Sequence, residues 1–253
     1  MSINDFKNAF YSLSKAKGYV ITIVLTLGIT LGALVAMFNL NYQLLAAPLP
    51  YPNADRLVVA KSERFDKQIL VKDRHAPYPA WIESYRQEDA QFEQKALLAY
   101  TVSIERRMPD SPVLNTISTT PEFFNMVQAP MKLGRRFGAS EGLDTMNPVA
   151  VISHRAWVKY FQQDPNVLSK TLNIMEIDFK IIGVLDENFV EPELYQRGWE
   201  TDVWLPMDYD DMPVQFRKNW NGSIGSAFWV GLLQKGVDKT AVEHSVSNRT
   251  AAR

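Results

Sequence analysis

The sequence contains no cysteine, which removes several kinds of chemistry from consideration. The chain can form no disulfide, and it offers no thiol nucleophile and no thiolate ligand for a metal. A domain of roughly 200 residues buries enough apolar surface to fold without disulfides. The absence is therefore compatible with an oxidising compartment such as a bacterial periplasm.

The signatures of nucleotide-dependent and hydrolytic enzymes are also missing. No G-x-x-x-x-G-K-[ST] segment occurs, so the chain carries no phosphate-binding P-loop. The segment 222–226 (G-S-I-G-S) does not match the G-x-S-x-G turn that exposes a nucleophilic serine. The net charge is −1, and no basic stripe interleaved with aromatic residues is present, so nucleic-acid binding has no support.

The residues that bind metals in other proteins do not group here as metal ligands do. His75, His154 and His244 lie far apart in sequence and match no short ligand spacing, so we expect structural roles for them. The acidic segment 208–211 (D-Y-D-D) lacks the loop glycine and the distal glutamate of an EF-hand, and we expect a solvated loop there. We therefore predict no catalytic, cofactor-binding or metal residue, no cofactor, and no enzymatic activity.

Charge is absent from a whole segment near the N-terminus, residues 18–54, which encloses an apolar run at 20–38. Nineteen residues at 1.5 Å each span roughly 28 Å, enough for the hydrocarbon core of a bilayer. A cleaved signal peptide usually has a shorter apolar region, and a buried core helix is seldom apolar on every side. We predict a transmembrane helix over residues 19–46.

Lysines predict the orientation of this helix. Lys7, Lys15 and Lys17 precede the run against one acid, Asp5, and the next charges after it are those of residues 55 and 56. Lysines next to a membrane helix stay on the cytoplasmic side. We expect a cytoplasmic N-terminus, an amphipathic helix over residues 1–18 on the inner membrane surface, and a main domain in the periplasm.

The apolar run has two unlike sides. Gly28 and Gly32 have the G-x-x-x-G spacing that lets helix backbones approach closely, and threonines and alanines lie on the same side. Glycine and threonine are also common in membrane helices in general. Because the small residues share one side, we expect this helix to pack against other transmembrane helices.

The remainder of the chain alternates between strand and helix patterns, which is typical of an α+β domain. Thr120 and Pro121 are expected to start a short helix that ends at residue 126, and Ser153 to start one that ends at residue 161. Another helix is expected over 78–91 and a last one from residue 240. Strands are predicted over 57–61, 92–104, 113–118, 149–152, 202–205 and 227–234, with a hairpin of 171–175 and 179–185.

Five aromatic residues in the second half allow two interpretations. They could line a ligand groove, although aromatic residues serve more often in a packed core. The five are Trp199, Trp204, Trp220, Phe228 and Trp229.

Several short segments resemble, in order and spacing, those of bacterial ABC-transporter permeases of the MacB/FtsX-like family, which carry a MacB-like periplasmic core domain. Each segment is weak alone, but together they extend from the N-terminal helix almost to the end of the sequence. They are residues 49–57 (L-P-Y-P-N-A-D-R-L), 119–124 (T-T-P-E-F-F), 134–137 (G-R-R-F), 149–153 (V-A-V-I-S), 179–184 (F-K-I-I-G-V), 202–206 (D-V-W-L-P) and 231–237 (G-L-L-Q-K-G-V).

The resemblance implies an inner-membrane permease that forms a homodimer, or a heterodimer with another permease. It implies that a separate ABC ATPase subunit hydrolyses ATP, and that the periplasmic domain engages exported substrate or an adaptor protein. It also implies a periplasmic core domain over 47–253 in two parts. The porter-like βα part would comprise 50–112 and 213–253, and the inserted β-rich part 113–212.

Two other functions remain open at this level. Because the family's later transmembrane helices are missing, we expect either the N-terminal part of a longer permease or a natural short relative. A single-pass, membrane-anchored periplasmic sensor or scaffold is the main alternative. A membrane-tethered hydrolase is a third, although no nucleophile or metal constellation favours it.

Overall fold

The computed structural model describes residues 15–45, 51–60, 62–66, 69–73, 76–196, 198–210, 220, 226–239 and 242. The chain divides into two compact units, residues 1–49 and 50–253, and each is described by itself. Most of the predicted amphipathic helix over 1–18, and most of the helix predicted from residue 240, lie outside the described residues.

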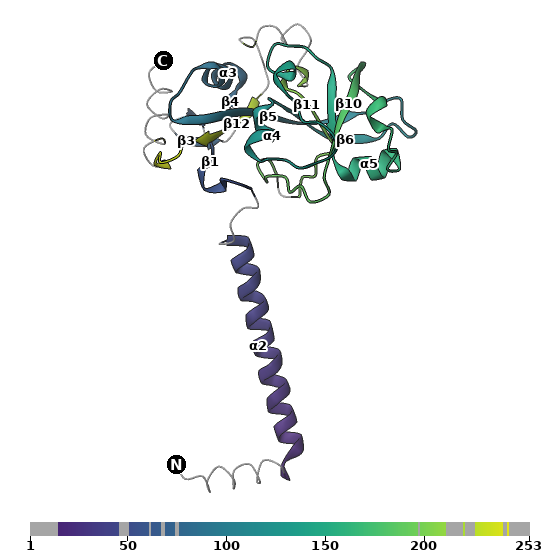
Figure 1. Cartoon of the computed structure of the whole chain (residues 1–253). Coiled ribbons are helices and arrows are strands. Elements are labelled where there is room, and N and C mark those ends of the chain that lie inside the picture. Colours follow the sequence, from purple (N-terminus) through teal and green to yellow (C-terminus); the bar gives the residue numbers. More distant parts are fainter. Residues whose placement is uncertain are drawn as a thin grey trace. The chain divides into compact units, whose positions relative to one another are not determined.

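The first unit contains one long helix, α2 (Lys17–Leu45), as predicted (Figure 1). Residues Lys17–Tyr42 are long and apolar enough to cross a membrane. The hydroxyls of its threonines are compatible with an apolar environment, because they donate to the carbonyl four residues earlier: Thr22 to Gly18 at 2.9 Å, and Thr26 to Thr22 at 2.7 Å. A polar group satisfied within its own helix is inexpensive to place in lipid.

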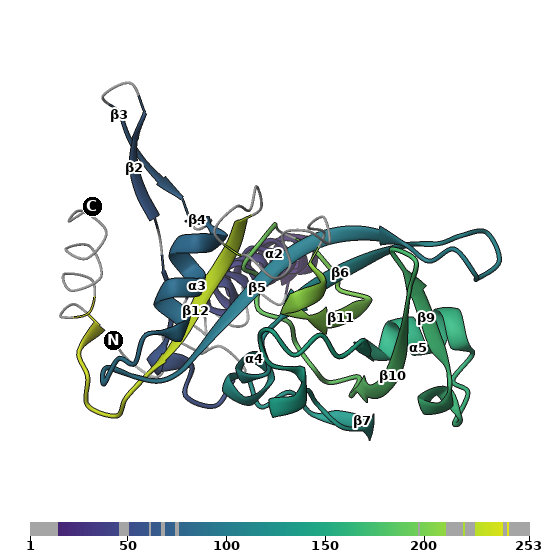
Figure 2. The same ribbon diagram turned by 90° about the horizontal axis from the view of Figure 1, so that it is seen from above.

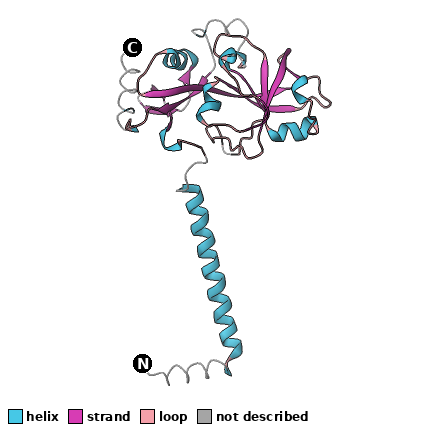
Figure 3. Cartoon of the chain, in the orientation of Figure 1, coloured by secondary structure: helices cyan, strands magenta, loops and turns pink. Residues whose placement is uncertain are grey.

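The second unit is built on a mixed β-sheet (Figures 2 and 3). Its strands follow the order β1-β12-β5-β6-β11-β8-β10-β7, with β4 beside β12 and β9 beside β10. A separate hairpin is formed by β2 (Ser62–Asp66) and β3 (Ile69–Asp73). The strands of the main sheet are β1 (Leu57–Val59), β4 (Ala76–Pro77), β5 (Phe92–Ile104), β6 (Val113–Thr119), β7 (Met131–Gly134), β8 (Val149–Ile152), β9 (Thr171–Ile174), β10 (Ile177–Leu185), β11 (Val203–Pro206) and β12 (Ser226–Leu233).

Among the described residues, three α-helices cover this sheet. Helix α3 (Tyr78–Arg86) packs on β12 and β5, α4 (Glu122–Met126) on β5, and α5 (His154–Phe161) on β10 (Figure 1). Two strand pairs are parallel, β6 with β11 and β8 with β10, and the others are antiparallel. The mixture of strand directions and helices confirms the predicted α+β class.

The buried side chains form three clusters, and the alternation of side chains along a strand explains why. In β8, Val149 and Val151 belong to one cluster, and Ala150 and Ile152 to the second, on the opposite face of the sheet. In β5, neighbouring residues are divided in the same way between the first cluster and a third beneath α3. Both faces of the central strands are therefore buried, which their nearly continuous apolar sequences require.

The start of α4 differs from the prediction. The helix begins at Glu122 with Pro121 as its N-cap residue, and no side chain caps it. The hydroxyl of Thr120 instead accepts a hydrogen bond from the backbone N–H of Leu97 at 3.1 Å. The hydroxyl that local sequence offers as a helix cap is therefore bonded to the neighbouring strand β5 instead. Helix α3 also ends at Arg86, earlier than predicted, and β7 was not predicted.

Candidate functional site

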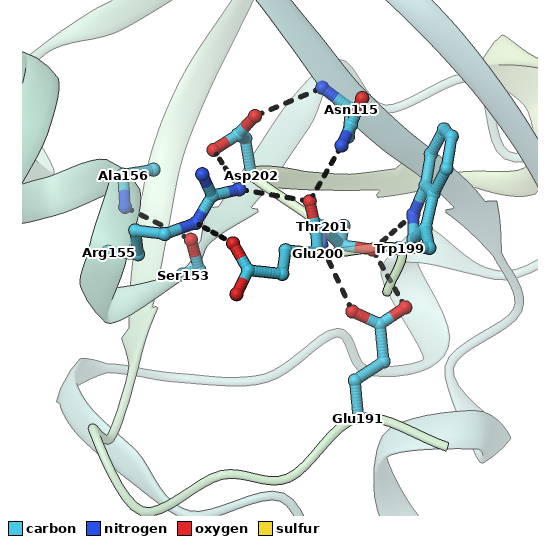
Figure 4. A network of polar contacts seen from close by, with 9 residues as sticks. All are labelled: Asn115, Ser153, Arg155, Ala156, Glu191, Trp199, Glu200, Thr201 and Asp202. Atoms are coloured by element: carbon cyan, nitrogen blue, oxygen red, sulfur yellow. Dashed lines mark hydrogen bonds and ion pairs between the residues drawn. The ribbon is translucent and has the colours of Figure 1, made fainter. Parts of the chain in front are cut away.

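A polar network gathers where the loop from Asp186 to Asp202 returns to the sheet (Figure 4). This loop, called loop 186–202, joins β10 to β11. The backbone N–H of its first residue, Asp186, donates to the carbonyl of Pro130 at 2.9 Å. Its last residue, Asp202, is buried and accepts from the backbone N–H of Asn115 at 3.0 Å.

Glu191 joins the two halves of the loop. One carboxylate oxygen accepts from the Thr201 hydroxyl at 2.7 Å, and the other from the Thr201 backbone N–H at 3.1 Å. The Thr201 oxygen also accepts from the indole N–H of Trp199 at 2.9 Å. Burial raises the pKa of Glu191 to about 7, although the bonds from Thr201 and the charge of Arg155 act in the opposite direction.

Arg155 connects α5 to this loop. Its guanidinium lies 2.8 Å from Asp202 and 3.4 Å from Glu200, and it donates to the Glu200 carbonyl at 2.9 Å. Local sequence places it there: the Ser153 hydroxyl accepts from the N–H of Ala156, as predicted, and fixes the first turn of α5. Burial raises the pKa of Asp202 against the opposing effects of Asn115 and Arg155.

Aromatic rings gather next to this network, which Trp199 joins through its bond to Thr201. Tyr195 stacks on Tyr100 of β5 with centroids 5.1 Å apart, and Trp199 meets both rings edge-on at 5.1 and 5.8 Å. Tyr195 is 44% exposed and Trp199 is half-buried, so the outer part of this group reaches the surface. The site thus combines one exposed ring, that of Tyr195, with the buried acid Asp202 and the partly buried acid Glu191, a composition suited to recognising a partner.

The other four aromatic residues considered in the sequence as lining a groove are part of the core. Trp204, Trp220, Phe228 and Trp229 are all buried, which confirms core packing for these four. Of the five, only Trp199 is partly exposed, and no pattern in the sequence distinguished it from the others.

The prediction of a solvated acidic loop at 208–211 is wrong for the two aspartates that the structure describes. Asp208 and Asp210 are both buried. The carboxylate of Asp208 accepts from the backbone N–H groups of Asp144 and Met146 at 2.7 and 2.8 Å, so it supports a neighbouring loop. Asp211 lies outside the described residues. Sequence spacing could not show this role because the donors lie more than sixty residues away.

The histidines do not converge in the part of the chain that the structure describes. His154 opens α5 and packs edge-on against Trp157 at 5.7 Å, whereas His75 and His244 lie outside the described residues. Among the described residues, no group of three or more acidic, histidine or cysteine side chains could hold a metal ion.

Solved structures similar to this chain include the following three. The first is a domain of a provisionally assigned permease protein from Porphyromonas gingivalis, with a TM-score of 0.55 and 19% identity, covering 79% of this chain and 82% of that one. The second is the periplasmic region of MacB from Actinobacillus actinomycetemcomitans, at TM-score 0.48 and 17% identity, covering 68% and 71%. The third is the extracellular domain of the noncanonical ABC-type transporter YknZ from Gram-positive bacteria, at 0.46 and 13%, covering 65% and 75%.

The first of these structures shows a shared fold. No curated protein matches the sequence. The model of the family described as the MacB-like periplasmic core domain matches residues 20–249, which is most of the chain. The predicted resemblance is confirmed, and the chain belongs to the family of ABC-transporter-type permeases that carry a MacB-like periplasmic core domain.

Proposed function

We propose that this chain acts as a permease subunit, or as part of one, in a mechanically coupled ABC transporter. The family match over residues 20–249 carries the proposal, because it includes both the apolar helix and the sheet domain. A separate subunit would hydrolyse ATP, and the periplasmic domain would itself be non-enzymatic. Its motion would act on exported substrate or on an adaptor protein.

The membrane arrangement is part of this proposal. Helix α2 would cross the inner membrane with the lysines at its start in the cytoplasm and the sheet domain in the periplasm. Gly28 and Gly32 would face other transmembrane helices, in a homodimer or in a heterodimer with another permease. Apart from the backbone of its own helix, a β-carbon added at either glycine would meet no described atom within 4 Å, so the small-residue side has room for a partner.

We also propose that the sheet domain has the two parts expected from the resemblance. The buried cluster around Trp157 and Phe179 draws its fully buried members from residues 114–209, within the proposed inserted part 113–212. The buried cluster around Trp81 and Trp229 lies mostly in the proposed porter-like part, 50–112 and 213–253. The strand pair β5–β6 would join them, because its register runs from Leu98↔Thr119 to Ile104↔Val113.

The surface around Tyr195 and Trp199 is the proposed contact region. Aromatic rings that reach the surface from an anchored loop, Tyr195 more fully than Trp199, lose little conformational entropy on binding, so they suit a protein or peptide partner. The neighbouring acids Glu193 and Glu200 are exposed and would favour a partner with basic groups.

Co-purification from native membranes tests the proposed function. The tagged full chain is expressed in its source cell, cross-linked, solubilised in mild detergent and identified by mass spectrometry together with its partners. An ABC ATPase is expected to co-purify with it and not with a tagged single-pass membrane protein that serves as control. Recovery of the cross-linked chain without any ATPase would refute coupling to a transporter and favour the sensor.

The cysteine-free sequence provides a direct test of orientation. Single substitutions Ser12→Cys and Lys235→Cys, the latter in an exposed turn, are treated in intact cells with a membrane-impermeant maleimide. Labelling of the Lys235→Cys variant alone is expected, with both variants labelled after the membrane is permeabilised. Labelling of the Ser12→Cys variant in intact cells would reverse the proposed orientation.

A further inference from the structure

The far end of the β5–β6 ribbon has an exposed apolar face. Val102 and Ile104 of β5 and Val113 of β6 are each between 49% and 60% exposed. Ile104 lies directly opposite Val113 across the ladder, and Val102 is two residues before Ile104 on the same face of the strand. The three side chains therefore form one patch, where β5 and β6 continue together beyond β12 (Figure 2).

This patch continues a face that is buried closer to the middle of the sheet. Alternation along β5 places Val102 and Ile104 on the same side as Tyr100, which packs against the first buried cluster. Tyr195 stacks on Tyr100 and is itself exposed, so it extends the patch. On the opposite face of the ribbon, by contrast, Leu114 is buried.

The concentration of exposed apolar side chains here is unusual for this domain. Outside α2, six of the described large hydrophobic residues are exposed, and four of them lie at this place. The solvent face of an antiparallel strand pair usually carries polar side chains. Neighbouring exposed apolar side chains are typical of an interaction surface. These four residues, Val102, Ile104, Val113 and Tyr195, are called the ribbon patch.

The two ends of the ribbon patch carry opposite charges. Arg106 follows Ile104 by two residues and is exposed, and its ion pair with the exposed Glu176, at 3.6 Å, is of the kind that contributes little. At the other end, the exposed acid Glu193 precedes Tyr195 by two residues. The patch is thus basic at one end, apolar in the middle and acidic at the other end.

We propose that the ribbon patch is a contact between two copies of this chain, related by a two-fold axis near Val102. A two-fold contact requires a surface that is complementary to itself. The two-fold axis places the Ile104 end of one copy on the Tyr195 end of the other. Apolar side chains then meet in the middle, and Arg106 approaches the second copy's Glu193.

The size of the ribbon patch favours a second copy over a soluble partner. Four side chains, each about half exposed, offer far less than the roughly 800 Å² per partner of a stable interface. A soluble protein would therefore bind weakly. A second copy held in the same membrane by its own α2 is present at a high effective concentration, so a small contact is sufficient. This step rests on the membrane arrangement proposed above.

Thiol cross-linking of the full chain in the membranes of expressing cells tests this inference, because the sequence contains no cysteine. Val102→Cys is treated with a bismaleimide that spans about 10 Å, the spacing of packed sheets. A product of two chains is expected and is identified by mass spectrometry. Val158→Cys is the matched control, because Val158 is 41% exposed on α5, outside the ribbon patch. Its cross-linking is expected to be at least about tenfold slower.

Three variants built on Val102→Cys test how the two copies meet. Ile104→Asp places a charge inside the patch and is expected to reduce cross-linking to the rate of Val158→Cys. Arg106→Glu places an acid against the second copy's Glu193 and is expected to slow cross-linking about threefold. Adding Glu193→Arg to this variant is expected to restore the rate, because opposite charges meet again. Tryptophan fluorescence confirms that each variant is folded.

Several results would overturn the inference. Val102→Cys could react no faster than Val158→Cys, Ile104→Asp could leave the rate unchanged, or the product could contain another protein in place of a second copy. A rate that Glu193→Arg does not restore would overturn the two-fold arrangement. Co-purification of an ATPase does not depend on the ribbon patch, so this inference and the proposed transport function can fail separately.

Discussion

The pairing of Glu141 with Arg135 allows a quantitative prediction about the sheet domain. The Glu141 side chain is fully shielded from solvent, and both of its oxygens accept from Arg135, at 2.8 and 3.0 Å. It also accepts from the backbone N–H of Gly138 at 2.7 Å and from Ser140 and Asn147. Burial alone would raise its pKa, but Arg135, Gly138 and Ser140 together lower it to about 2.

The lowered pKa of Glu141 corresponds to a contribution to the free energy of unfolding. The difference from 4.5 to about 2 corresponds to about 3.5 kcal/mol at most, because one unit of pKa is about 1.4 kcal/mol. The Arg135 side chain is 54% exposed, so water screens part of the attraction and we expect about 2 kcal/mol. A lowered acid pKa means that this stability is present above about pH 4.5 and is lost as pH falls towards 2.

The assay is urea unfolding of the full chain, followed by tryptophan fluorescence. All six tryptophans lie between residues 81 and 229, so the signal reports the sheet domain alone. Glu141→Gln is expected to lower the free energy of unfolding by about 2 kcal/mol at pH 7, and by progressively less below pH 4.5. The matched control Glu187→Gln removes an exposed carboxyl 3.8 Å from Lys132 and should cost less than about 0.5 kcal/mol. A difference between Glu141→Gln and wild type that is negligible at pH 7, or that is constant with pH, would refute the reasoning.

Substitutions at three further positions test the fold by the same unfolding assay. Gly134→Ala should destabilise by more than about 2 kcal/mol, because its φ is +68° and a β-carbon would lie 2.1 Å from a backbone carbonyl oxygen; an effect below about 0.5 kcal/mol would contradict this local geometry. Trp204→Ala should cost about 3 to 5 kcal/mol through the cavity it leaves, and a mild effect would mean that the side chain is not in the core. Ser153→Ala should cost about 1 kcal/mol by removing the N-cap of α5, whereas Ser153→Asp should restore it; equal losses in both variants would argue against capping.

The elements with strong local patterns were predictable from sequence. Strand β5 was predicted at its observed limits, and the cap at Ser153 and the hairpin of β9 and β10 were also confirmed. In each case the information lies within a few residues: alternation of side chains, a serine before an amphipathic turn, or two strands separated by a short turn.

The contacts that make up the site were not predictable in this way. Glu191 lies in an irregular loop, and its role arises from Thr201, from Tyr100 of β5 and from Arg155 of α5, which only the folded chain brings together. Asp208 could not be predicted for the same reason. An acid in a polar segment is expected to be solvated, and its burial becomes clear only when its distant backbone donors are known. Hydrogen bonds between buried polar groups that are distant in the chain produce no periodic pattern in the sequence.

The pairing of β1 with β12 has a mechanical consequence. Leu57, at the start of β1, lies opposite Leu232, near the end of β12. The chain therefore enters this sheet and leaves its last strand at neighbouring points, joined by a three-residue ladder. A displacement applied through either connection would therefore reach the domain at the same edge of the sheet.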